Sequence, residues 1–199
     1  MTLATGRQGT GKTTFLLRYL VAEKSITCRF IFDPRGDMGD RLGLPHAENG
    51  DELECAIDDG FVLYDPALMF PGNPDAGFEW FAAWSYGRAC KLPGKKTLLI
   101  DEVWKHCSPN SIPISLAQWI QDGRKYGLHP MFATQMPNRL NGAITNELTE
   151  LVCFRLQERN ALDSVSRLGA DAEEVLSLPM GAFVSLNLET GGELRGRLW

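Results

Sequence analysis

A glycine-rich loop near the start of the chain carries the residues best suited to chemistry. Gly6, Gly9 and Gly11 lead into Lys12 and Thr13, in the spacing G-x-x-x-x-G-K-[ST]. Glycines let the backbone bend tightly and point successive N–H groups inward, where they can cradle phosphate oxygens. In loops of this kind the lysine reaches the β- and γ-phosphates and the hydroxyl ligates Mg²⁺. The spacing therefore predicts a phosphate-binding loop for a nucleoside triphosphate.

We expect the whole loop to contact the phosphates. The residues of this predicted binding loop are Gly6, Arg7, Gln8, Gly9, Thr10, Gly11, Lys12, Thr13 and Thr14. An apolar stretch precedes the loop and a helical pattern follows it, which is the strand–loop–helix context that the motif requires. The N-terminal end of that helix adds a positive dipole end beneath the phosphates.

Two carboxylates follow a second apolar stretch, in the form of a Walker B motif. Leu98, Leu99 and Ile100 lead directly into Asp101 and Glu102. We expect Asp101 to accept hydrogen bonds from the water shell of Mg²⁺, so Thr13 and Asp101 are the predicted metal residues. Glu102 is the predicted catalytic base that polarises an attacking water. An acidic pair favours steady hydrolysis by a motor, whereas small GTPase switches orient the water with a glutamine.

A polar amide ends another apolar stretch. Gln135 directly follows Met131–Thr134. At the tip of a strand beside the two carboxylates, this amide would contact the γ-phosphate or the attacking water. The sequence therefore predicts Gln135 as a sensor of hydrolysis.

The elements that must position these groups alternate along the chain. The sequence predicts strands over 3–5, 29–32, 61–64, 97–100, 131–134 and 151–154. It predicts helices over 12–23, 52–58, 77–90, 114–126, 143–147 and 160–168. Short apolar runs without in–out alternation are typical of a mostly parallel sheet that helices cover on both faces, so the predicted fold class is α/β.

The last part of the chain has a different pattern. Residues 182–188 and 193–199 flank a turn at 189–192. This arrangement predicts a C-terminal β-hairpin at the edge of the sheet or at a subunit boundary. We predict a single domain over residues 1–199.

Composition limits the classes of function. The net charge of −5 argues against a protein that coats nucleic acid over its whole surface, but a local basic channel remains compatible with it. No apolar run approaches the ~18 residues of a membrane span, and the scattered cysteines are typical of free thiols, so we expect a cytosolic protein. Basic residues in loops and at element ends are candidate contacts for DNA phosphates: Arg35, Lys91, Lys95, Lys96, Lys105, Arg124, Lys125 and Arg139.

The order of these motifs resembles the HerA/FtsK group of P-loop ATPases. The resemblance is strongest to the genome-packaging ATPases of tailless icosahedral phages with an internal membrane (tectivirus-like). It extends over nearly the whole chain, and the order of the motifs is more specific than any one of them. The segments that carry it are Gly6–Thr13, Phe32–Asp37, Leu98–Glu102, Asp122–Gly127 and Ala133–Gln135.

The resemblance implies a RecA-like (ASCE) sheet with an extra strand between the two nucleotide-binding strands. It assigns the roles of phosphate lysine, magnesium hydroxyl, Walker B aspartate, catalytic base and sensor to Lys12, Thr13, Asp101, Glu102 and Gln135 respectively. It also implies an arginine that serves the nucleotide of the neighbouring subunit. Arg124 is the residue we predict for this role, with Arg155 and Arg159 as reserves.

The function that the resemblance implies is an ATP-hydrolysing motor that moves double-stranded DNA into a viral procapsid, with ATP and Mg²⁺ as cofactors. The expected partners are duplex DNA, further copies of the chain in a hexameric ring, and viral vertex or small membrane packaging proteins. We expect no direct membrane insertion, and a location at the packaging vertex of the virion or in the host cytoplasm. Nothing precedes the first strand, and no winged helix or membrane span is found, which favours a reduced packaging motor.

Two alternatives stay open. A small P-loop kinase has a similar length, although the Asp101–Glu102 pair is atypical for one. A nucleotide-dependent morphogenesis or assembly ATPase of a phage would hydrolyse ATP without moving DNA.

Overall fold

The computed structural model describes the backbone of residues 1–199 and every side chain except that of Arg124. Eight strands are formed: β1 (Thr2–Thr5), β2 (Ile26–Phe32), β3 (Phe61–Tyr64), β4 (Lys95–Ile100), β5 (Met131–Thr134), β6 (Glu150–Phe154), β7 (Ala182–Asn187) and β8 (Glu193–Arg197). The longer helices are α1 (Lys12–Ala22), α3 (Gly50–Asp59), α5 (Pro74–Ala89), α6 (Ile114–Gln121) and α9 (Arg159–Arg167). The shorter ones are α2 (Asp37–Leu42), α4 (Pro66–Met69), α7 (Gly123–Tyr126), α8 (Gly142–Asn146) and α10 (Ala172–Ser177), with 3₁₀ turns η1 (Val103–Lys105) and η2 (Pro137–Arg139).

The chain divides into two compact units. The first consists of Met1–Arg18, Glu102–Ile112 and Met131–Trp199, and the second of Tyr19–Asp101 and Pro113–Pro130. The sequence-based prediction of one domain over residues 1–199 stays a prediction.

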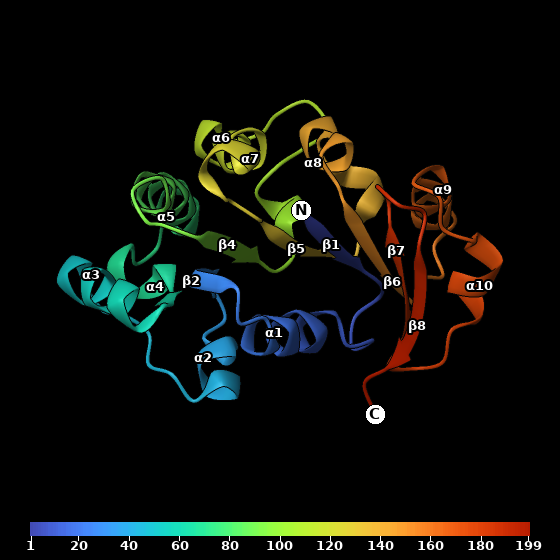
Figure 1. Cartoon of the computed structure of the whole chain (residues 1–199), viewed down its shortest axis with the longest axis horizontal. Helices are drawn as coiled ribbons and strands as arrows, with labels where there is room; N and C mark the ends of the chain where they lie inside the picture. The colour runs from blue at the N-terminus through green and yellow to red at the C-terminus, as the bar shows by residue number, and fades with distance from the viewer. The chain divides into compact units, whose positions relative to one another are not determined.

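In the first unit the strands follow the order β5-β1-β6-β7-β8 (Figure 1). Strand β1 is parallel to both neighbours, and Thr5 is paired with Thr134 on one side and Cys153 on the other. The segments that follow β1, β5 and β6 therefore leave the sheet at the same edge. Strand β7 is antiparallel to β6, and β8 is antiparallel to β7, so the predicted C-terminal hairpin is confirmed and lies at an edge of the sheet.

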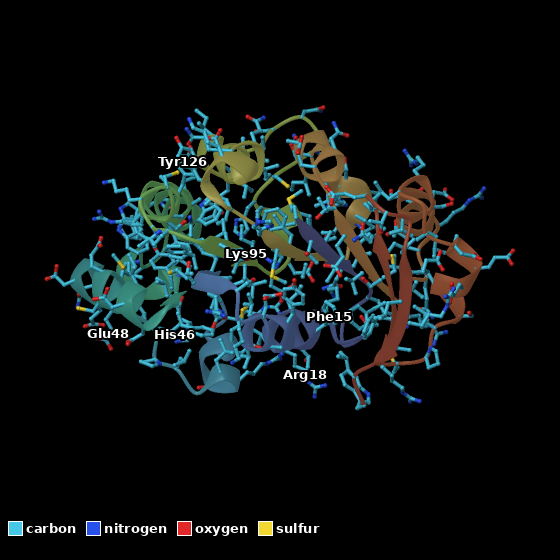
Figure 2. All side chains as sticks on the ribbon, viewed as in Figure 1. Phe15, Arg18, His46, Glu48, Lys95 and Tyr126 are labelled. Carbon is cyan, nitrogen blue, oxygen red and sulfur yellow. The ribbon has the colours of Figure 1, made fainter. Side chains whose placement is uncertain are left out.

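Three aromatic rings join α1 to the hairpin in this unit. The ring centre of Phe15 lies 4.9 Å from that of Phe183 and 6.0 Å from that of Phe154 (Figure 2). Burial of rings of this size is a major source of stability, because each removes a large apolar area from water. The start of α1, and with it the glycine-rich loop, is thereby anchored against β6 and β7.

In the second unit the strands follow the order β3-β2-β4, all parallel. Its core is aromatic: the rings of Tyr64 and Phe81 stack with their centres 4.5 Å apart, and Phe30 lies edge-on to Trp119. Phe78 and Phe81, both in α5, are buried in this core.

The α/β fold class is confirmed, and all eight strands form where the sequence predicts them within a few residues. The predicted helix over 114–126 is instead two helices, α6 and α7, which are separated at Asp122. Asp122 has φ −88° and ψ 5°, and its carboxylate accepts a hydrogen bond from the Tyr86 hydroxyl. Helices α2, α4 and α10 are too short to give an apolar period in the sequence. Among the described helices, none is both long enough and apolar enough to cross a membrane.

Candidate nucleotide-binding site

The predicted phosphate-binding loop connects β1 to α1 in the first unit. Gly11 has φ 112°, in the left-handed region that favours glycine, and Gly9 has φ 77°. The Arg7 N–H donates to the Arg155 carbonyl at 3.0 Å, and the buried Thr10 hydroxyl donates to the Arg7 carbonyl at 2.8 Å. These bonds hold the loop in a fixed curve above the edge of the sheet.

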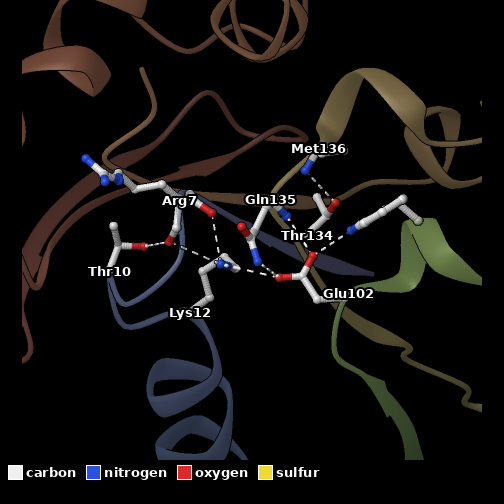
Figure 3. Close-up of polar contacts among 9 residues, drawn as sticks. Arg7, Thr10, Lys12, Glu102, Thr134, Gln135 and Met136 are labelled. Atoms are coloured by element: carbon white, nitrogen blue, oxygen red, sulfur yellow. Dashed lines mark hydrogen bonds and ion pairs between the residues drawn. The ribbon is translucent and has the colours of Figure 1, made fainter. Parts of the chain in front are cut away.

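Lys12 is the first residue of α1 and is only 5 % exposed. Its ammonium donates to the carbonyls of Gly6 at 2.9 Å and Arg7 at 3.3 Å (Figure 3). The same Nζ lies 3.7 Å from Oε1 of Glu102, which is also buried. The loop thus encloses a positive charge between two of its own carbonyls and a carboxylate.

Glu102 lies directly before η1 and has left-handed backbone angles, φ 52° and ψ 48°. Such a conformation costs about 1–2 kcal/mol for a residue with a Cβ, and it persists only where surrounding contacts impose it. Trp104 and Gln135 supply these contacts. Oε1 accepts from Gln135 Nε2 at 2.7 Å, and Oε2 accepts from Trp104 Nε1 at 2.7 Å and from the Gln135 N–H at 3.1 Å.

The sheet brings Gln135 to the glycine loop. Strand β5 pairs with β1 so that Thr134 faces Thr5, and the Gly6 N–H donates to the Thr134 carbonyl at 3.3 Å. Gln135 follows immediately, so its amide lies beside the loop and reaches Glu102. Residues that are far apart in the sequence therefore meet at one edge of the sheet, as expected for the carboxyl ends of parallel strands.

The structure brings Lys12, Glu102 and Gln135 together within the first unit (Figure 3). Thr13 and Thr14 lie in the first turn of α1, directly after the loop. Asp101 follows β4 in the second unit, so its part in holding a metal stays a prediction.

The sequence predicts that Arg124, with Arg155 and Arg159 as reserves, serves the nucleotide of a neighbouring subunit. The side chain of Arg124, in α7, lies outside the described residues. The backbone of Arg155 supports the glycine loop, and Arg159 is the exposed first residue of α9. The role of each in a neighbouring subunit stays a prediction.

Sequence reasoning did not identify Trp104 or the place of Arg139. The Trp104 indole donates to Glu102, and the Arg139 guanidinium carbon lies 5.3 Å from the centre of the Trp104 ring. The only available signal was that Trp104 stands two residues after Glu102. Nothing in the spacing indicated that the chain would turn back there and direct the indole N–H at the carboxylate.

The interpretation of Lys96 as a DNA contact is wrong. This side chain is 2 % exposed, and burial lowers the pKa of its ammonium. Nζ donates to the carbonyls of Leu92 at 2.7 Å, Gly94 at 2.8 Å and Tyr126 at 2.5 Å. Lys96 therefore ties loops of the second unit together. The other candidates with described side chains reach solvent, with Lys95 partly covered: Arg35, Lys91, Lys95, Lys105, Lys125 and Arg139.

Comparison with known proteins gives an answer at the level of the fold. No protein-family model matches the chain, and no curated protein sequence matches it. Among solved structures, it is similar to the genome-packaging NTPase B204 of Sulfolobus turreted icosahedral virus 2 in complex with AMPPCP. The TM-score is 0.75 at 18 % identity, over 100 % of this chain and 97 % of that one.

Two further solved structures are similar in fold to this chain. B204, the DNA-packaging ATPase of Sulfolobus turreted icosahedral virus, gives a TM-score of 0.69 at 19 % identity, over 100 % of this chain and 97 % of that one. The bacterial conjugative coupling protein TrwB gives 0.68 at 13 % identity, over 100 % of this chain and 84 % of that one. The chain has the fold of the P-loop ATPases that include viral packaging ATPases and coupling ATPases, which confirms the resemblance seen in the sequence at the level of the fold.

Proposed function

We propose that this chain is an ATP-hydrolysing motor that translocates double-stranded DNA into a viral procapsid. The observation that carries the proposal is the convergence of the Lys12 ammonium, the Glu102 carboxylate and the Gln135 amide at the mouth of a glycine-rich loop. The similarity in fold to a DNA-packaging ATPase supports the choice of DNA as the cargo.

The loop fits a triphosphate on its own geometry. The positive φ angles at Gly9 and Gly11 support this, because such glycines let a loop turn its N–H groups toward an anion. Lys12 would hold the β- and γ-phosphates, and Thr13 with Asp101 would hold Mg²⁺. When bound, Mg²⁺ neutralises charge that develops on the phosphate oxygens.

Glu102 is the residue that we assign to activate water. Its carboxylate is held by hydrogen bonds from Trp104 and Gln135 rather than by solvent, so it is oriented before the substrate arrives. A carboxylate so placed accepts the proton of the attacking water, while Lys12 stabilises the charge of the phosphoryl group. Phosphoryl transfer depends mainly on such positioning and electrostatic stabilisation.

An exposed cation is connected to this carboxylate through a single side chain. Arg139 stacks on the Trp104 ring, and Nε1 of that ring donates a hydrogen bond to Glu102. Binding of a DNA phosphate by Arg139 would move its guanidinium relative to Trp104. This contact offers a short physical route by which DNA alters the rate of hydrolysis, despite the net charge of −5.

The test measures ATP turnover with and without duplex DNA, together with displacement of a third strand from a DNA triplex. We expect duplex to raise turnover and the third strand to be released only with ATP. The control is Glu102→Gln, which should bind ATP without releasing the strand.

The alternatives predict different results. Turnover that is insensitive to duplex, with no strand release, would favour an assembly ATPase. Transfer of the γ-phosphate to a nucleotide acceptor would favour a kinase. Either outcome contradicts the proposed motor.

A further inference from the structure

The last two residues of the sequence lie against the phosphate-binding loop. A Cβ at Gly11 would be 2.6 Å from Cδ1 of Leu198 and 3.1 Å from Cη2 of Trp199. Met180, at the start of the hairpin, lies 4.0 Å from the place that a Cβ would take on Gly9. The glycines thus allow an apolar wall to approach the loop closely, and a larger residue at Gly11 would push it away.

This wall lies on the opposite side of β1 from the reacting groups. Gln135 follows β5 on one side of β1, whereas β6, β7 and β8 lie on the other. Because β7 and β8 alternate in direction, the start of β7 and the end of β8 meet at the sheet edge where β6 ends (Figure 1). A triphosphate with its γ-phosphate at Glu102 and Lys12 would bring its nucleoside near Leu198 and Trp199 if it extended along the loop away from β5.

The wall is fixed in place by its backbone. The Leu198 N–H donates to the Gly181 carbonyl at 2.9 Å, and the Leu198 carbonyl accepts from Nη1 of Arg18, in α1, at 2.9 Å. The wall is therefore tied both to the start of β7 and to the helix that follows the loop.

The indole of Trp199 packs against Gly181 and is also partly open to solvent. A Cβ at Gly181 would lie 2.7 Å from Cε2, 3.0 Å from Nε1 and 3.1 Å from Cδ2 of the ring, so Gly181 lies directly beneath it. The residue is nevertheless 57 % exposed. An exposed aromatic ring beside a phosphate-binding loop is a surface on which a planar base can stack.

We infer that Trp199, supported by Leu198 and Gly181, is the platform for the nucleobase of the bound triphosphate. The inference rests on the proposed function in requiring a nucleotide at the loop, and it adds the recognition of the base. Stacking is tolerant of the base, because every base presents a π face. The ring therefore contributes affinity for nucleotides and none for the phosphate chain alone.

The test compares the affinity of Trp199→Ala for ATP and for inorganic tripolyphosphate by calorimetry. We expect the dissociation constant for ATP to rise about 10-fold or more, and that for tripolyphosphate to change less than about 2-fold. Trp199→Phe should recover most of the affinity for ATP because it keeps an aromatic face. Leu194→Ala, an exposed apolar change in the same hairpin, is the matched control and should bind both ligands as the unaltered protein does.

Three results would overturn the platform. These are an unchanged ATP affinity in Trp199→Ala, an equal loss for ATP and tripolyphosphate, and no recovery in Trp199→Phe. In each of these cases the unaltered protein still binds nucleotide, so the results do not contradict the proposed function as a motor. If the unaltered protein binds neither ATP nor tripolyphosphate, the proposed function fails and the platform fails with it.

Discussion

Two buried lysines, one in each unit, have similar surroundings at first sight. The ammonium of Lys12 donates to two backbone carbonyls in the first unit, and that of Lys96 donates to three in the second. Both side chains are almost fully buried. A buried charge is costly unless it is hydrogen-bonded, and backbone carbonyls satisfy both.

What differs is the backbone that surrounds each charge. Lys12 lies inside a loop of glycines whose N–H groups can turn inward, and a carboxylate lies 3.7 Å from its Nζ. Lys96 lies among loop carbonyls, which repel an anion. The comparison shows that burial and hydrogen bonding of a lysine do not by themselves distinguish a binding group from a structural one, whereas the neighbouring anion-binding groups do.

The largest expected effect follows from removing the first of these ammonium groups. Lys12→Ala should lower ATP turnover about 10²–10³-fold, because a charge that stabilises the transferring phosphoryl group is lost. The free energy of unfolding should also fall, because two buried carbonyls lose their donor and the buried Glu102 carboxylate loses its cation. Steady-state turnover and urea unfolding measure the two quantities. Lys24→Ala, in the exposed turn after α1, is the control, and equal turnover in the two variants would contradict the assignment.

Removing the ammonium of Lys96 should lower stability without lowering turnover. Lys96→Met keeps the length of the side chain but leaves three carbonyls without their donor, so the free energy of unfolding should fall by about 3 kcal/mol. At temperatures where the variant is folded, its ATP turnover should match that of the unaltered protein. Urea titration measures the loss, with Lys95→Met as the matched control. A turnover defect without a stability defect would mean that the two lysines do not differ as described.

A smaller loss of ATP turnover is expected from a change at Trp104, in the first unit. Trp104→Phe keeps the ring on which Arg139 stacks but removes the N–H that Glu102 accepts. One hydrogen bond to a charged group is worth about 1.5–3 kcal/mol, so kcat should fall about 10-fold or more while KM for ATP changes little. Trp104 acts through Glu102, and a merely structural role would lower stability and leave the kcat of the folded fraction unchanged. Steady-state kinetics with a parallel unfolding curve separates the two.

The sequence predicted the groups whose spacing is set by local chemistry. The glycine loop, the acidic residues after β4 and the amide after β5 are read from contiguous residues, and the parallel sheet explains why Lys12, Glu102 and Gln135 meet. It did not predict contacts that depend on how side chains turn in space. Lys96 was interpreted as a surface cation because it stands in a basic loop, and only the folded chain shows the carbonyls around its ammonium.

The sequence also did not predict the helix break at Asp122 or the placement of Trp199, because both depend on contacts between segments that are distant in the sequence. Residues 114–126 carry a continuous helical pattern, and the structure separates two helices at a residue whose carboxylate the Tyr86 hydroxyl reaches from α5. The tail reads as an ordinary strand, and its approach to Gly11 follows from the hairpin pairing with β6.

The most direct measurement of the central claim is single-turnover ATP hydrolysis by Glu102→Gln. The substitution keeps the shape and removes the charge, so ATP should bind with unchanged affinity while the rate of hydrolysis falls by about 10³-fold. Glu158→Gln, an exposed change in the same unit, should hydrolyse at the unaltered rate. Hydrolysis by Glu102→Gln at the rate of the unaltered protein would contradict the assignment of Glu102 as the base, and with it the account of the site.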